Sequence, residues 1–122
     1  STARQHLNTG GLLIFDFWYA PAIRRNPPSK SNKKSGRGDL SIYRKTVGKL
    51  DPKYNFIQIN CDLKKGSTKD RESHTVRYFD LDELRSLVFN SRFNNINLSE
   101  FDDITKVPNK NNWQAIAWSN AI

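Results

Sequence analysis

Residues 38–63 read GDLSIYRKTVGKLDPKYNFIQINCDL, and the predicted fold depends chiefly on the strand patterns in this stretch. From residue 54 to 63 the side chains alternate, with Ile57, Ile59, Cys61 and Leu63 on one parity and mostly polar residues on the other. Such alternation is typical of a strand with one face in a core. Residues 39–47 also have a strand pattern, and Gly48 with Asp51-Pro52 predicts the turn between the two segments.

Working outward, the sequence predicts two more strands and one helix. GLLIFDFWYA (11–20) is apolar on both parities and ends at Pro21, which favours a buried or half-buried strand. HTVRYF (74–79) is the fourth strand. Asp80 with Glu83 forms a capping-box pattern, and the apolar spacing after it predicts an amphipathic helix over about 81–92.

The remaining segments are expected to be irregular. Residues 24–38, RRNPPSKSNKKSGRG, carry six cations and no apolar side chain of any size, so we expect a long, mobile basic loop. Residues 64–73, KKGSTKDRES, are expected to form another charged turn, and residues 94–122 an irregular C-terminal segment. The predicted fold is therefore α+β in a single domain, residues 1–122, with a four-stranded antiparallel sheet, one amphipathic helix after it, and the basic loop between strands 1 and 2.

Positive charge is concentrated in one part of the chain. The stretch from Arg24 to Arg71 holds 14 of the 20 Lys and Arg residues but only four of the 12 acids. A local basic excess of this kind is the electrostatic footprint of a protein that meets a polyanion. A solvated basic loop with no ligand is the alternative.

Aromatic side chains at strand-like spacing lie within the same stretch. Exposed aromatics beside cations are the two components of single-stranded nucleic-acid binding, although the same aromatics could instead belong to the core. The predicted nucleic-acid-binding residues are Arg24, Arg25, Lys33, Lys34, Arg37, Tyr43, Arg44, Lys45, Lys53, Tyr54, Phe56, Lys64 and Lys65.

The order of elements resembles that of the Whirly and positive-cofactor-four-like single-stranded DNA-binding proteins. The residues that suggest it are 38–63 and VRYFDLDELRSLV (76–88), where a strand runs directly into the helix. The Lys-Gly-Lys-Ala-Ala-Leu signature of the plant Whirly proteins is absent, and so is a second set of four strands. The resemblance implies a twisted antiparallel sheet, dimerisation through helices, and DNA rather than RNA on the sheet and its loops.

Other chemistry has little support in the sequence. Cys61 is the one cysteine, and His6 and His74 are the two histidines, so the ligand spacing of a metal site is missing. The sequence contains no glycine-rich phosphate loop, so we expect no cofactor. A lone cysteine favours a reducing intracellular compartment, in the cytoplasm or with the nucleoid or nucleus. No apolar run approaches the roughly 18 residues that span a bilayer, so no membrane contact is expected.

The sequence thus predicts a non-catalytic protein that binds single-stranded nucleic acid, with no cofactor. A homodimer is expected, because one helix cannot cover a four-stranded sheet and its edges. Two alternatives remain open. One is a small metal-independent ribonuclease of the toxin type that uses Arg71, His74, Arg77 and Tyr78. The other is a protein-interaction or assembly module whose basic loop meets an acidic partner.

Overall fold

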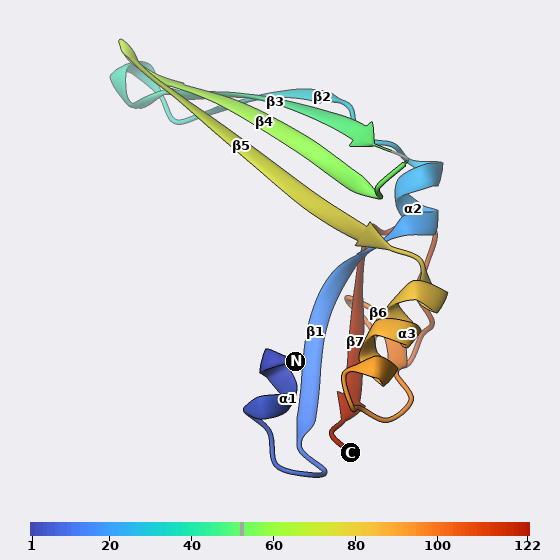
Figure 1. Ribbon diagram of the computed structural model, residues 1–122. Coiled ribbons are helices and arrows are strands. Elements are labelled where there is room, and N and C mark those ends of the chain that lie inside the picture. The colour runs from blue at the N-terminus through green and yellow to red at the C-terminus, as the bar shows by residue number, and fades with distance from the viewer. Residues whose placement is uncertain (52) are drawn as a thin grey trace. The chain divides into compact units, whose positions relative to one another are not determined.

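The computed structural model describes residues 1–51 and 53–122 (Figure 1). The chain divides into two compact units, unit 1 from residues 1–26 and 78–122, and unit 2 from residues 27–77. The elements are α1 (Thr2–Gln5), β1 (Leu12–Tyr19), α2 (Ala20–Arg25), β2 (Lys30–Ser35), a 3-10 turn (Gly38–Leu40), β3 (Ile42–Asp51), β4 (Phe56–Lys65), β5 (Thr68–Phe79), α3 (Leu81–Asn90), β6 (Asn97–Glu100) and β7 (Gln114–Asn120). No helix in these residues is long and apolar enough to cross a membrane.

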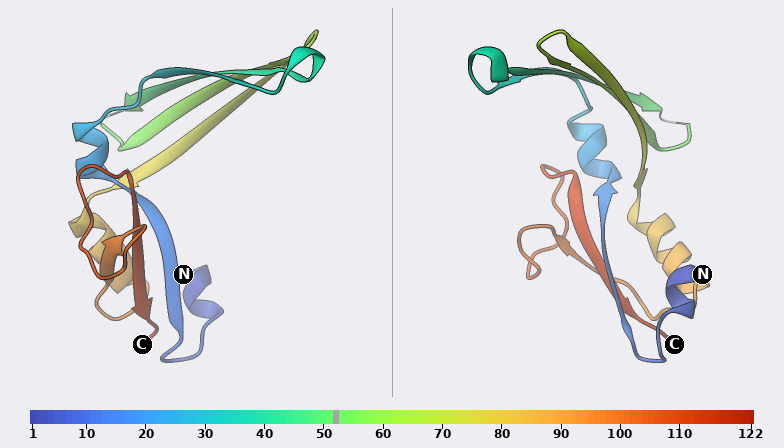
Figure 2. Two further views of the ribbon diagram at one scale, coloured as in Figure 1. Left: turned by 180° about the vertical axis from the view of Figure 1, so that it is seen from behind. Right: turned by 90° about the vertical axis from the view of Figure 1, so that its left-hand side faces the viewer.

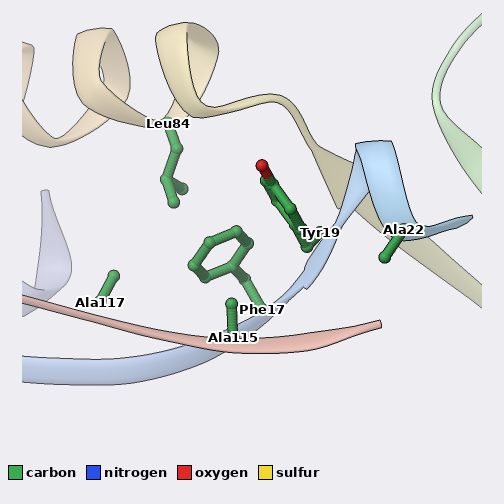
Figure 3. Close-up of a cluster of buried hydrophobic side chains, with 6 residues drawn as sticks. All are labelled: Phe17, Tyr19, Ala22, Leu84, Ala115 and Ala117. Atoms are coloured by element: carbon green, nitrogen blue, oxygen red, sulfur yellow. The ribbon is translucent and has the colours of Figure 1, made fainter. Parts of the chain in front are cut away.

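Unit 1 is a sheet with helix α3 on one face. Strand β7 lies between β1 and β6 and is antiparallel to both. Alternate residues of β1 point to the helix side, and this side forms the core: Phe17 and Tyr19 pack with Leu84 of α3 and with small residues of β7 (Figure 3). Ala115 and Ala117 are fully buried, which lets the helix lie close to the sheet.

A second cluster completes the core of unit 1 at the other end of α3. Val88 and Phe93 are buried there with Ala121. Ala3 of helix α1 and Leu7, which follows the helix, pack against the same cluster. The N-terminal turn of the chain is therefore held against the same side of the sheet as α3.

Unit 2 is an antiparallel meander in the order β2-β3-β4-β5 (Figure 2). The β4–β5 connection is a two-residue turn, because Lys65 pairs with Thr68 and only residues 66 and 67 lie between them. Gly66 has φ 59°, which is the positive angle that the first central residue of a type II′ hairpin turn requires. This turn fixes the register of the whole β4–β5 pair.

The last two residues of β5 belong to unit 1 and pair in parallel with β1, through Trp18↔Tyr78 and Tyr19↔Phe79. Hydrogen-bonded strands therefore follow the order β2-β3-β4-β5-β1-β7-β6. The predicted fold class is wrong, because the sheet is mixed and has seven strands instead of four antiparallel ones. The strands near 12–19 and 56–63 and the helix near 81–92 are confirmed.

Three segments that were predicted to be irregular are regular. Within residues 24–38, the cations at 24 and 25 end helix α2, and residues 30–35 form β2, although all six side chains of that strand are exposed. Because no side chain of β2 is buried, its strand conformation comes from backbone pairing with β3. The charged segment 64–73 is strand except at its turn, and residues 94–122 contain β6 and β7. The single-domain expectation for residues 1–122 stays a prediction.

Candidate functional site

One face of the unit 2 sheet carries two parallel rows of side chains that come from all four strands. Because cross-strand partners share a face, the register defines the rows. They are Asn32–Lys45–Asp62–Arg71 and Lys34–Tyr43–Lys64–Lys69. Between them runs the row Lys33–Arg44–Leu63–Asp70, whose side chains alternate to the opposite face.

These three rows line a hollow of about 590 Å³, which we call the basic hollow. The two outer rows stand on either side of it, and the middle row contributes mainly backbone to its floor. Five of the eight side chains in the outer rows are cations and one is an acid. That acid, Asp62, lies 3.5 Å from Arg71.

The hollow therefore keeps an uncompensated positive charge beside an aromatic ring. Lys34 Nζ lies 5.4 Å from the centre of the Tyr43 ring, and Tyr43 is 49% exposed. Lys64 and Lys69 follow Tyr43 in the same row, and this row contains no acidic residue. Ammonium groups on flexible stems around an open hollow suit an anionic ligand, and the ring adds a face for a planar group.

The opposite face of this sheet is more apolar and holds Cys61. Ile57 and Cys61 are buried. The Cys61 Sγ lies 3.6 Å from Thr46 Oγ1 and 3.7 Å from an Arg44 guanidinium nitrogen. These contacts, with Thr46 first, lower the pKa of the thiol. Arg44 is therefore directed toward Cys61 and away from the hollow.

Arg24 is committed to an ion pair in unit 1. Its guanidinium donates two hydrogen bonds of 2.7 Å to the two carboxylate oxygens of Asp80. Asp80 does stand at the N-cap of α3, but its side chain makes no capping hydrogen bond. The Asp80 half of the predicted capping box is thus wrong, because Arg24 binds the carboxylate that would have capped the helix.

This ion pair has a pH dependence with a definite sign. The Arg24 hydrogen bonds hold the pKa of Asp80 below the usual value of an aspartate, about 3.9. Its contribution to stability is therefore present above that value and is lost as the pH falls through the lower, folded-state pKa. We expect Asp80→Asn to lower the free energy of unfolding by up to about 1 kcal/mol at pH 7, since both partners are partly exposed.

Chemical denaturation of parent and variant between pH 7 and pH 3 measures this effect. The control is Asp82→Asn, in the same first turn, whose side chain is 99% exposed. A deficit of Asp80→Asn that persists unchanged at pH 3 would show that the carboxylate is not the cause.

The three predicted aromatics do not form one platform. Tyr43 lies in the basic hollow. Phe56 is on the same face, but the register places it eight residues along β4 from the partner of Tyr43, roughly 27 Å away. Tyr54 lies in the β3–β4 connection, 58% exposed, with Lys53 Nζ 5.2 Å from its ring centre. The prediction that all three form a single stacking surface is therefore wrong.

The structure separates the other predicted cations in the same way. Lys34, Lys45 and Lys64 meet in the hollow. The register places Lys33 and Lys65 on the opposite face, with Arg44. Arg37 precedes the 3-10 turn, and Arg25 ends α2 in unit 1. That these residues bind a nucleic acid stays a prediction.

Residues of the ribonuclease alternative do not converge. Arg71 and Arg77 share one face of β5, while His74 is on the other, 3.5 Å from Glu72. Tyr78 belongs to unit 1 and is 1% exposed. Within residues 1–51 and 53–122, no three His, Cys, Asp or Glu side chains gather where they could hold a metal ion.

Four residues of the outer rows were not among the predicted nucleic-acid-binding residues: Asn32, Asp62, Lys69 and Arg71, the last of which was named only for the ribonuclease alternative. A signal for three of them was present. Gly66-Ser67 between two polar strands is typical of a two-residue hairpin turn, and its register pairs Lys64 with Lys69 and Asp62 with Arg71. Asn32 had no such signal, because nothing in residues 24–38 indicates a strand.

No protein-family model matches this sequence, and no curated protein matches it. Solved structures do share its fold. The chain is similar to an S-adenosylmethionine-dependent methyltransferase from Clostridium acetobutylicum, with a TM-score of 0.74 and 12% identity over 97% of this chain and 47% of that one. It is also similar to the CcbJ methyltransferase from Streptomyces caelestis, with a TM-score of 0.69 and 17% identity over 99% of this chain and 50% of that one.

A third neighbour is DesVI from Streptomyces venezuelae, with a TM-score of 0.63 and 12% identity over 98% of this chain and 48% of that one. The chain thus spans about half the length of these structures. The Whirly-like fold suggested by the order of elements is wrong, since the chain shares its fold with the two methyltransferases instead. The prediction of a non-catalytic, Whirly-like DNA-binding protein is corrected with it.

Proposed function

We propose that this chain takes part in enzymatic methyl transfer and supplies the side of the enzyme that holds the methyl acceptor. The observation that carries the proposal is the likeness of nearly the whole chain to two methyltransferases, with TM-scores of 0.74 and 0.69. The basic hollow in unit 2 is the acceptor site in this proposal, and it selects an acceptor with an anionic group.

The donor named in one neighbour, S-adenosylmethionine, carries its transferable methyl group on a positively charged sulfonium. Neither the strand-to-helix junctions nor the basic hollow in residues 1–51 and 53–122 suits this group. In α/β folds a nucleoside cofactor is commonly held at a glycine-rich turn between a buried strand and a helix. The two strand-to-helix junctions of unit 1, at Tyr19–Ala20 and Phe79–Leu81, contain no glycine.

Three other parts of the chain are also unsuited to binding a positively charged sulfonium nucleoside. Gly36 and Gly38 lie in the β2–β3 connection, after a strand that is exposed throughout. Beyond the end of β1, the Asp80 carboxylate is taken by Arg24. In the basic hollow, five cations repel a cationic ligand. We therefore assign the donor to the half of the methyltransferase fold that has no counterpart in residues 1–122.

We accordingly expect residues 1–122 alone not to bind S-adenosylmethionine. Isothermal titration should detect no binding of the donor at millimolar concentration, whereas inorganic tripolyphosphate should bind at low ionic strength through the hollow. The Lys34→Glu/Lys64→Glu variant serves as the control, since it should lose only the second of these. Saturable donor binding to the chain alone would contradict the division of roles.

Methyl transfer itself is tested with the native protein, including any further chain or domain that accompanies residues 1–122 in the cell. The protein is incubated with S-adenosylmethionine labelled in its methyl group and with small molecules of the source cells, separated by charge. Label is expected in the anionic fraction. Absence of any labelled product, from protein that binds the donor, would refute the proposed function. Label in the neutral or cationic fractions alone would refute the role of the hollow.

A further inference from the structure

The face of the unit 1 sheet opposite to α3 is apolar and uncovered. The β1 residues that alternate away from the core are Leu12, Ile14, Asp16 and Trp18, and the register places Trp118 and Ile116 of β7 beside Ile14 and Asp16. Leu12 is 54% and Ile14 is 60% exposed. Both core clusters of unit 1, with the helices that pack on them, use the other parity of β1. We call this surface the outer face.

Strand β1 also has an open edge beside this face. Its antiparallel partner β7 occupies one edge along its whole length, while β5 pairs on the other edge only with Trp18 and Tyr19. Over residues 12–17 no strand of the described chain lies on that second edge. Six residues are about the usual length of a strand.

Backbone hydrogen bonds identify the groups that point to this edge. Ala121 N donates to Gly11 O, and Tyr19 N donates to Trp113 O. Because bonded pairs recur every second residue in an antiparallel ladder, the odd-numbered residues of β1 bond to β7. The amides of Leu12, Ile14 and Asp16 therefore point to the open edge.

We propose that the outer face and the open edge of β1 form the docking surface for an α/β segment, in which a strand pairs with β1 and a helix covers Leu12, Ile14, Ile116 and Trp118. Sheets with parallel pairs are covered by helices on both faces, and here α3 covers one face only. An open edge beside an exposed apolar face also invites uncontrolled pairing unless it is covered.

The occupant is the half of the methyltransferase fold without a counterpart in this chain, and to that extent the inference rests on the proposed function. The fold neighbours are about twice as long as this chain, so half of each lies outside the aligned part. A second copy of this chain is the competing occupant. Two copies joined by their β1 edges would cover each other without any additional segment.

Amide hydrogen exchange, followed by NMR at each residue, tests the docking surface. In isolated residues 1–122, the amides of Leu12, Ile14 and Asp16 should exchange rapidly. In the native protein with its complete fold they should be slower by about two orders of magnitude or more. Leu13, Phe15 and Phe17 are the internal control, because their amides bond to β7 and should be protected in both.

A variant pair separates docking from folding. Ile14→Glu should melt like the parent as an isolated chain, since the side chain is exposed, but should lose the protection of the edge amides in the native protein. Val107→Glu, 78% exposed and in the same unit, should change neither. Sedimentation of the isolated chain shows whether copies pair.

Each outcome decides the inference. Edge amides that exchange equally fast in isolated chain and native protein would overturn it, and so would a β1-paired dimer that Ile14→Glu dissociates. Failure of the proposed function looks different. A protein that protects the edge but transfers no methyl group would keep the docking surface and refute methyl transfer.

Discussion

Replacement of Phe17 by alanine is expected to remove about 3–5 kcal/mol from the free energy of unfolding of unit 1. The ring is 7% exposed and fills the space between α3 and the sheet, against Leu84 and the alanines of β7 (Figure 3). The small side chains of Ala115 and Ala117 cannot fill the cavity that this leaves. Such a loss is a large part of the roughly 5–15 kcal/mol that stabilises a typical domain.

The three tryptophans make this measurement specific. Trp18, Trp113 and Trp118 all belong to unit 1, so their fluorescence during denaturation reports that unit. Phe89→Ala is the matched control, since this ring lies on α3 but is 64% exposed, and its loss should cost about 0.5 kcal/mol or less. Equal losses in the two variants would mean that Phe17 is not the centre of the core.

Reversal of two charges in the basic hollow, Lys34→Glu with Lys64→Glu, is expected to weaken binding of inorganic tripolyphosphate about 100-fold at low ionic strength. Both side chains stand in the row beside Tyr43. Each ammonium that contacts a phosphate contributes a charge-assisted hydrogen bond of about 1.5–3 kcal/mol, and about 1.4 kcal/mol corresponds to tenfold in affinity. The loss should shrink as salt screens the charges.

The chain offers a control of equal charge. Lys33→Glu with Lys65→Glu changes the net charge by the same amount on the same two strands, but the register puts both side chains on the opposite face. Isothermal titration of both variants at two salt concentrations compares them, after each is shown to melt like the parent. Equal losses would show that binding follows net charge and not the hollow.

Local elements with a strong pattern could be predicted from the sequence. The alternation of residues 54–63 and the apolar run of 12–19 gave strands, and the spacing after Asp80 gave a helix; the structure confirms all three. Each of these segments buries one face, so its own side chains carry the signal. Strand β2 has no such face, and only its backbone bonds to β3 make it a strand.

For the site, the sequence predicted which residue types are present but not how they are arranged. A basic excess between residues 24 and 71 and a tyrosine at 43 were visible, and Tyr43 and five of these cations stand in the outer rows of the hollow. Which cations face the same way was not visible, because a shift of one residue in register exchanges the two faces of a strand. Lys33 and Lys34 are neighbours in sequence, yet the sheet assigns them to different faces.

The order of residues alone shows which segments can bury a face and where positive charge accumulates. Only the tertiary structure decided that β5 leaves its antiparallel meander and ends in parallel with β1, which turns a predicted four-stranded sheet into a mixed one. It also decided that Arg24 forms an ion pair with Asp80. The physical reason is that pairing between distant strands depends on backbone groups that every residue carries, so side-chain patterns record it only where a face is buried.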